Sequence, residues 1–195
     1  MINAKLDLRE VLQQVTTAIS EEIVQCSSVG IYLPQGDGTY RGYAGKPEIM
    51  SGMTLQSQVI DPTTDSLAAE LIETRKTIYI ADTLKDGRPN PESVDAFQIK
   101  SLLALPISFE KELFGMVFLF DYGTPMNLSE AEIETVEAYV NMAGVAIQNA
   151  KTFSQKEKLL EEKQLLLDLT RELSFCSTIR ESLKVCFSYL QQACG

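Results

Sequence analysis

The chain contains no histidine, and this absence removes several classes of function. Histidine is the commonest general base, the usual axial ligand of haem and a frequent zinc or iron ligand, so the sequence excludes most such sites and any phosphohistidine relay. Basic residues are also few: 17 Lys and Arg stand against 27 Asp and Glu, a net charge of −10. That charge opposes contact with nucleic-acid phosphates and anionic lipid. We therefore expect neither a nucleic-acid nor a membrane partner.

Long apolar runs and paired cysteines are missing as well. No run approaches the roughly 18 apolar residues that span a bilayer, and residues 1–5 lack the basic-then-apolar order of a signal peptide. No two cysteines form a C-x-x-C pair, and their spacing does not suggest the framework of a small secreted domain. We expect a cytoplasmic protein with reduced, mostly buried thiols, no metal and no cofactor. The cysteines are Cys26, Cys176, Cys186 and Cys194.

Apolar spacing predicts a mixture of helices and strands in the first two thirds of the chain. Steps of three and four residues indicate amphipathic helices, whereas short apolar runs bounded by turn formers indicate strands. The predicted elements are, in order, a helix over 8–23, a hairpin of strands at 28–33 and 39–44, a short strand at 53–55, a helix over 65–75, a strand at 77–80, an irregular segment at 81–90, a short helix over 91–99, and buried strands at 101–107 and 113–120.

The clearest periodic signal follows a capping box formed by Ser129 and Glu132. Apolar residues alternate steps of three and four as far as Ala150, and then recur every seven residues up to Leu173. A helix over 128–173 is about 69 Å long at 1.5 Å per residue, more than a compact domain of this size can cover. We therefore expect a homodimer through the terminal helices. The predicted dimer seam is Val140, Ala143, Ile147, Phe153, Leu160 and Leu167.

The alternative interpretation of this helix is that it folds back on its own domain. Such packing would account for the apolar residues from Ile133 to Ile147, but not for the leucines beyond Leu159. Further along, residues 178–183 repeat the cap, the Arg-Glu pair and the apolar spacing of residues 7–12. Either an ordinary capped helix or the start of a second, similar domain explains that repeat.

The order of these elements resembles the GAF domain family over roughly residues 5–152. The most specific pieces are residues 101–107, 114–119, 128–133 and 143–150, taken in that order. The resemblance implies an α+β fold with a central antiparallel sheet of about six strands flanked by helices, and a long C-terminal signalling helix. It also implies a small-molecule cavity under the irregular segment. Candidate ligand-binding residues are Tyr43, Tyr79, Asp82, Phe97 and Ser101, each of which could instead fill the core.

The sequence departs from the family's best-known ligand sites. Cyclic-nucleotide-binding members carry an Asn-Lys pair after the last strand, where this chain has Asp121 and Tyr122. Bilin-binding members use a cysteine, usually beside a histidine, and haem-binding members use histidine. The methionine-sulfoxide-reducing members need clustered cysteines, whereas Cys26 is alone within residues 1–152. No known catalytic branch of the family is supported.

The resemblance thus implies a non-catalytic sensory and dimerisation module. It would couple small-molecule or partner binding in the cavity, through a paired helix, to an effector domain in the same full-length chain. The alternatives are an enzyme that acts on a small metabolite in the same cavity, with Asp82, Ser101 or Cys26 as reactive groups, and a ligand-free dimerisation scaffold. The expected organisation is a sensory domain over 1–152, a coiled-coil-like linker helix over 153–175, and the start of a second domain over 176–195.

Overall fold

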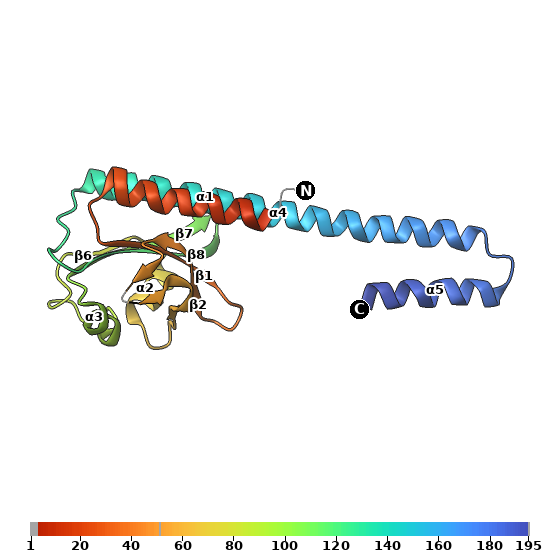
Figure 1. Ribbon diagram of the computed structural model, residues 1–195, viewed down its shortest axis with the longest axis horizontal. Coiled ribbons are helices and arrows are strands. Elements are labelled where there is room, and N and C mark those ends of the chain that lie inside the picture. The colour runs from red at the N-terminus through yellow and green to blue at the C-terminus, as the bar shows by residue number, and fades with distance from the viewer. Residues whose placement is uncertain (1–3, 51, 195) are drawn as a thin grey trace. The chain divides into compact units, whose positions relative to one another are not determined.

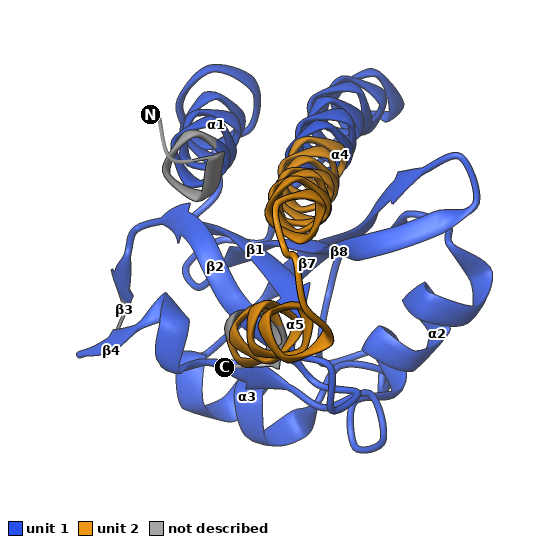
Figure 2. Ribbon diagram, turned by 90° about the vertical axis from the view of Figure 1, so that its right-hand side faces the viewer, with its two compact units in different colours: residues 1–150 blue, residues 151–195 orange. Residues whose placement is uncertain are grey.

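The computed structural model of the chain describes residues 4–50 and 52–194 (Figure 1). The chain divides into two compact units, residues 1–150 and 151–195 (Figure 2). The elements of unit 1 that precede its last helix are α1 (Ala4–Ala18), the π-helical turn η1 (Ile19–Ile23), β1 (Ser28–Pro34), β2 (Tyr40–Lys46), β3 (Ile49–Met50), β4 (Met53–Thr54), the 3₁₀ turn η2 (Leu55–Ser57), β5 (Val59–Ile60), α2 (Ser66–Thr74), β6 (Ile78–Ile80), α3 (Pro91–Phe97), β7 (Ser101–Phe109) and β8 (Glu112–Asp121).

Helix α4 (Glu130–Ser174) begins in unit 1 and continues through the boundary between the units. The predicted capping box starts it: the Ser129 N–H donates to Glu132 Oε2 at 2.8 Å, and the Glu132 N–H donates to Ser129 Oγ at 3.3 Å. These two bonds satisfy backbone donors that the first helical turn leaves without an intrahelical partner. The long terminal helix expected from the apolar period is therefore confirmed.

A six-stranded sheet in the order β5-β2-β1-β8-β7-β6 forms the centre of unit 1, and its paired strands are antiparallel. The predicted sheet of about six strands is thus confirmed. The 53–55 segment differs from the prediction: β4 pairs with β3 in a separate two-stranded ribbon, and Leu55 already belongs to η2. Leu55 lies against β2, where an added Cβ on Gly42 would clash with the Leu55 carbonyl oxygen.

The two faces of the sheet carry separate apolar cores. Successive strand side chains point to opposite faces, so neighbouring residues of β8 enter different cores. Val117 and Leu119 pack with the helices on one face, whereas Met116 and Phe118 pack on the other. Figure 2 shows α1 and the unit 1 part of α4 above the sheet, and α3 below it. One layer of strands therefore separates the α3 side of the sheet from the helices on the other side.

Helices α1 and α4 bury their apolar stripes against the first of these faces. Leu12 of α1 and Ile19 of the following turn η1 are buried there, together with Val136, Val140 and Ala143 of α4. The next residue, Gly144, lies so close to β7 that an added Cβ would stand 2.6 Å from the Ser108 carbonyl oxygen. Helix and strand can approach this closely because glycine has no side chain.

Unit 2 consists of the α4 residues from 151 onward and α5 (Ile179–Cys194). Within it, the Tyr189 hydroxyl donates to Glu172 Oε1 at 3.0 Å. Glu181 caps the start of α5 by accepting from the Ser177 and Thr178 N–H groups. Across residues 4–50 and 52–194, no helix combines the length and the apolar character that a bilayer-spanning segment needs.

Candidate functional site

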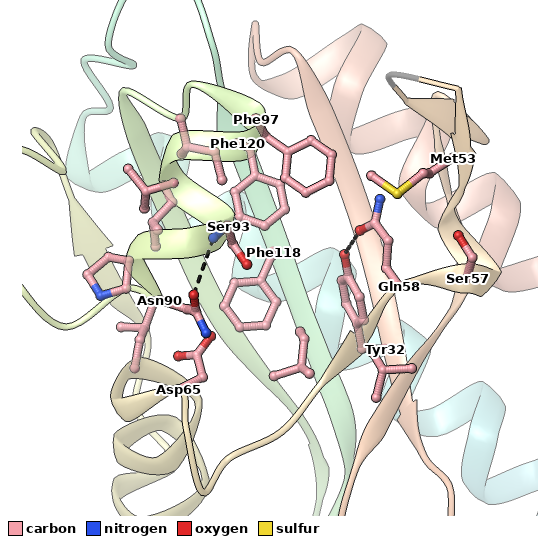
Figure 3. Close-up of a pocket in the computed structure, with 17 residues that line it drawn as sticks. Tyr32, Met53, Ser57, Gln58, Asp65, Asn90, Ser93, Phe97, Phe118 and Phe120 are labelled. Atoms are coloured by element: carbon pink, nitrogen blue, oxygen red, sulfur yellow. Dashed lines mark hydrogen bonds between the residues drawn. The ribbon is translucent and has the colours of Figure 1, made fainter.

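A cavity of about 230 Å³ lies on the α3 face of the sheet. Its walls come from β1, β7 and β8 of the sheet, from the chain around β5, from the first residues of α2, and from α3 (Figure 3). Four aromatic side chains line it: Tyr32, Phe97, Phe118 and Phe120. The Phe118 and Phe120 rings are parallel with centroids 5.8 Å apart, and Tyr32 meets Phe118 edge to face at 5.7 Å. Mostly apolar walls with a few polar groups are typical of small-molecule pockets.

Gln58 and Tyr32 supply polar atoms on one side of the cavity. The Tyr32 hydroxyl donates to Gln58 Oε1 at 2.7 Å. Burial raises the pKa of Tyr32 well above its usual value, so the hydroxyl keeps its proton and stays a donor. Gln58 Nε2 is buried and has no hydrogen-bond partner. The cavity wall therefore holds an amide donor that is not used within the protein.

Asp65 supplies a carboxylate from the start of α2. Its side chain caps that helix, because Oδ1 accepts from the Ala68 N–H at 3.0 Å. Burial raises the pKa of Asp65 above its ordinary value, against the backbone N–H bonds that lower it. No lysine or arginine lines the cavity in the parts of the chain that the structure describes.

The roof of the cavity is the irregular segment 81–90 together with α3. Arg88 fastens it, since its guanidinium bonds both Asp86, at 2.6 Å from Nη2, and Glu70 of α2, at 3.1 Å from Nη1. The Arg88 guanidinium holds the pKa of Asp86 below its usual range. Asn90 then caps α3 by accepting from the Glu92 and Ser93 N–H groups. The roof is thus tied to α2 and ends in a capped helix.

Of the five predicted ligand-binding residues, the structure places Phe97 at the cavity. Tyr43 is half-buried in the helix-side core, where the Arg9 guanidinium carbon lies 5.8 Å from its ring centroid. Asp82 caps a turn and pairs with Lys85 at 2.9 Å, a contact that lowers the pKa of Asp82. Neither residue lines the cavity.

The remaining two, Tyr79 and Ser101, hold the segment that leads into α4. The Met126 N–H donates to Ser101 Oγ at 2.7 Å, and Ser101 is fully buried. The Tyr79 hydroxyl donates to the Met126 carbonyl and accepts from the Leu128 N–H at 3.2 Å. These contacts engage the hydroxyl groups of both side chains. Tyr79 and Ser101 therefore position the start of the helix and do not face the cavity.

None of the reactive groups proposed for an enzyme lines the cavity. Asp82 is paired with Lys85, Ser101 accepts from a backbone N–H, and burial, with a smaller contribution from Asp121, raises the pKa of Cys26 to about 12. A thiol with that pKa stays protonated at neutral pH and is a poor nucleophile. In the described ranges, no group of three or more His, Cys, Asp or Glu residues is placed to hold a metal ion.

The predicted dimer seam divides into two groups. Val140 and Ala143 are 1% and 0% exposed because they pack against the sheet within unit 1. This packing is the one that the alternative interpretation describes, and Ile147 is half-buried against the same core. The outer positions differ: Leu160 and Leu167 are each 65% exposed, and Phe153 is 49% exposed.

Sequence reasoning missed the residues that give the cavity its chemistry: Tyr32, Gln58, Asp65, Phe118 and Phe120. Phe118 and Phe120 lie two apart in a predicted strand, so the sequence did indicate that they share a face. It could not indicate which face, because the strand is apolar on both. Asp65 stands at the start of a predicted helix, a position that gives no sign that its side chain also lines a cavity.

Comparisons with known proteins agree with this fold. The family model described as GAF domain matches residues 7–147. A dual 3′,5′-cyclic-AMP and -GMP phosphodiesterase 11A from Takifugu rubripes is 23% identical over 161 residues, which are 77% of this chain and 18% of that protein. The blue-light-absorbing form of the PixJ GAF domain from Thermosynechococcus elongatus has a TM-score of 0.68 at 16% identity, covering 83% of this chain and 97% of that one. The GAF domain/HD domain protein from Geobacter sulfurreducens has a TM-score of 0.64 at 15% identity, covering 76% and 96%. At such identities the structural likeness shows a shared fold.

Proposed function

The chain belongs to the GAF domain family, and from that premise we propose that it is a sensory and dimerisation module of a signalling protein. A small molecule binds in the cavity under α3, and the state of the cavity is passed to α4. Paired copies of α4 carry the signal to an effector domain in the same full-length chain. The named relatives support a regulatory role, since one is a phosphodiesterase of which the chain covers 18% and another is a light-absorbing domain.

Coupling between cavity and helix is supported by the alternation along the strands. Phe118 lines the cavity, and its neighbours Val117 and Leu119 pack in the core that holds α4. A second connection runs along β7: Leu102 lines the cavity, and the preceding Ser101 holds the Met126 N–H just before the helix. A ligand that shifts either strand therefore moves atoms that α4 or its leading segment rests on.

One observation supports dimerisation. The apolar residues of α4 are buried in the first part of the helix and exposed further along it. In unit 2 its outer leucines lie in water, while Leu165, Leu169 and Leu173 are half-buried. The exposed set is Phe153, Leu159, Leu160, Leu166 and Leu167. Burying each such side chain against a second copy contributes about 1.5–3 kcal/mol before the ordering costs, so the set is large enough to sustain a dimer.

Sedimentation equilibrium of the full chain tests this proposal. We expect a dimer for the native sequence and a monomer for the double variant Leu160→Lys/Leu167→Lys, because two charges would then be placed in the apolar seam. The control is Ser154→Lys/Glu161→Gln, which changes the net charge by the same two units. At 3.6 residues per turn, both control positions are turned away from Leu160 and Leu167 by about 100–140° around the helix.

The control variant should remain a dimer, and circular dichroism should give the same helix content for all three proteins. A native chain that sediments as a monomer at high protein concentration overturns the proposal. So does a dimer that the two lysines leave intact, because the interface then lies elsewhere.

A further inference from the structure

The cavity beneath α3 has a defined chemistry as well as a shape, and this inference rests on the proposal that the cavity binds a ligand. Its volume of about 230 Å³ is below the roughly 300–1,000 Å³ of pockets for drug-sized ligands. It therefore suits a ligand of one or two rings. A purine nucleoside cyclic phosphate, with four rings, is larger than this space favours.

The aromatic walls favour a flat ligand. Phe118 and Phe120 present parallel rings, and Tyr32 stands perpendicular to Phe118. Aromatic groups prefer offset-stacked or edge-to-face contacts, and these two arrangements of the walls offer both. A planar aromatic ring gains more binding free energy from such walls than a flexible chain does, because the ring loses little conformational freedom on binding.

The polar atoms at the two ends of the cavity are of different kinds. Figure 3 shows Tyr32 and Gln58 on one side of the Phe118 ring, with Asp65 and Asn90 on the other. On the first side, the buried Nε2 of Gln58 is a donor without a partner. A buried donor left unpaired costs free energy, so a ligand that brings an acceptor to it is favoured. On the second side, a carboxylate can only accept while it is ionised.

Anions are disfavoured at this site. Asp65 would repel a phosphate or a carboxylate, and no lysine or arginine among the described residues lines the cavity to attract one. Asn90 already accepts from the first free N–H groups of α3, whose N-terminal residue is a proline. No backbone N–H of that turn is left to hold a phosphate.

From these contacts we infer that the cavity binds a phosphate-free, amino-substituted nitrogen heteroaromatic of one or two rings. A ring nitrogen accepts from Gln58 Nε2, and the amino group donates to the Asp65 carboxylate. The ring itself lies among Tyr32, Phe97 and Phe118. Neutral or singly protonated aminopurines and aminopyrimidines have this combination of groups.

Isothermal titration of the full chain with four related compounds tests the inference. Adenine carries all the inferred groups, purine lacks the amino group, adenosine adds an uncharged sugar, and cyclic AMP adds the phosphate as well. We expect adenine to bind at least ten times more tightly than either purine or cyclic AMP, because each loses or opposes the contact with Asp65. The affinity for adenosine should lie between those for adenine and cyclic AMP. This comparison separates the effect of ligand size from that of ligand charge.

Two variants assign the effects to residues. Asp65→Ser keeps a good helix cap but removes the carboxylate, so the preferences for adenine over purine and over cyclic AMP should both shrink at least fivefold. Methionine has a shape similar to that of glutamine but no N–H donor. Gln58→Met should therefore weaken the binding of adenine and of purine by the same factor. The controls are Asp61→Ser, at a turn outside the cavity, and Gln56→Met, an exposed residue outside it. Neither control should change the affinities.

Cyclic AMP binding as tightly as adenine, with Gln58→Met weakening both, would overturn the inferred chemistry and leave the cavity as a ligand site. Binding of none of the four compounds overturns the inferred ligand class. The sedimentation experiment still reports on the proposed dimer in either case, so failure of the one proposal is distinguishable from failure of the other.

Discussion

Replacing Gly144 with alanine tests how closely α4 lies on the sheet. An added Cβ would stand 2.6 Å from the carbonyl oxygen of Ser108 and 3.3 Å from its carbonyl carbon. Both are backbone atoms of β7, so neither can rotate aside as the end of a side chain would. Either α4 must lift away from β7 or the strand must bend.

Two terms of opposite sign set the magnitude. Exchanging glycine for alanine inside a helix favours folding by about 1 kcal/mol. Overpacking a well-packed core costs about 1–3 kcal/mol, and the contact with rigid backbone places this site in the upper half of that range. We therefore expect Gly144→Ala to lower the free energy of unfolding by about 1–2 kcal/mol, although helix propensity alone predicts an increase.

Urea denaturation of the full chain, followed by circular dichroism, measures this change. Gly87→Ala is the control, because a Cβ at that exposed loop position meets nothing within 4 Å. It should leave stability unchanged or raise it by up to about 1 kcal/mol through the unfolded chain. If Gly144→Ala instead stabilises the protein by about 1 kcal/mol, the close contact between α4 and Ser108 does not exist in solution.

Three further predictions use the same denaturation assay. Ser101→Ala should cost about 1–3 kcal/mol, since it leaves the Met126 N–H buried without an acceptor; no loss would mean that the bond does not form. Phe118→Ala should cost about 3–5 kcal/mol, because the ring is buried between the strands and the cavity; a loss below about 1 kcal/mol would contradict that burial. Burial raises the pKa of Asp65, so the unfolded carboxyl ionises first and this residue destabilises the fold as pH rises above its ordinary pKa. The stability of Asp65→Asn relative to the native protein should therefore increase from pH 3 to pH 7, and a difference independent of pH would refute this.

The fold could be predicted largely because its elements have strong local signals. The capping box at Ser129 and Glu132 and the apolar period behind it depend on residues three or four positions apart, and the structure forms both. The hairpin of β1 and β2 follows equally from its turn-forming segment. The exceptions are short. Residues 53–55 were expected as a strand, but Met53 and Thr54 pair with β3, a strand of two residues that the sequence did not predict, and β5, the sixth strand of the sheet, was not predicted either.

The site could not be predicted because it depends on which face each strand presents. Ser101 lies beside cavity residues in sequence, since Leu102 follows it and Ile99 is two residues before it. Neighbouring residues of a strand face opposite sides of the sheet. Leu102 therefore lines the cavity, whereas Ser101 faces the other way and holds the segment before α4. Gln58 gave no signal of its own, since its role comes from the Tyr32 hydroxyl that occupies its other amide atom.

The same alternation supports the proposed coupling between the cavity and α4, which lie on opposite faces of the sheet. One residue separates Phe118, at the cavity, from Leu119, in the core beneath α4. Close-packed interiors transmit small displacements because they contain little free volume to absorb them. At Gly144 the helix touches backbone with no side chain between, so a movement of β7 there reaches α4 directly. Flexible side chains at that point would absorb the displacement, and Gly144 has no side chain.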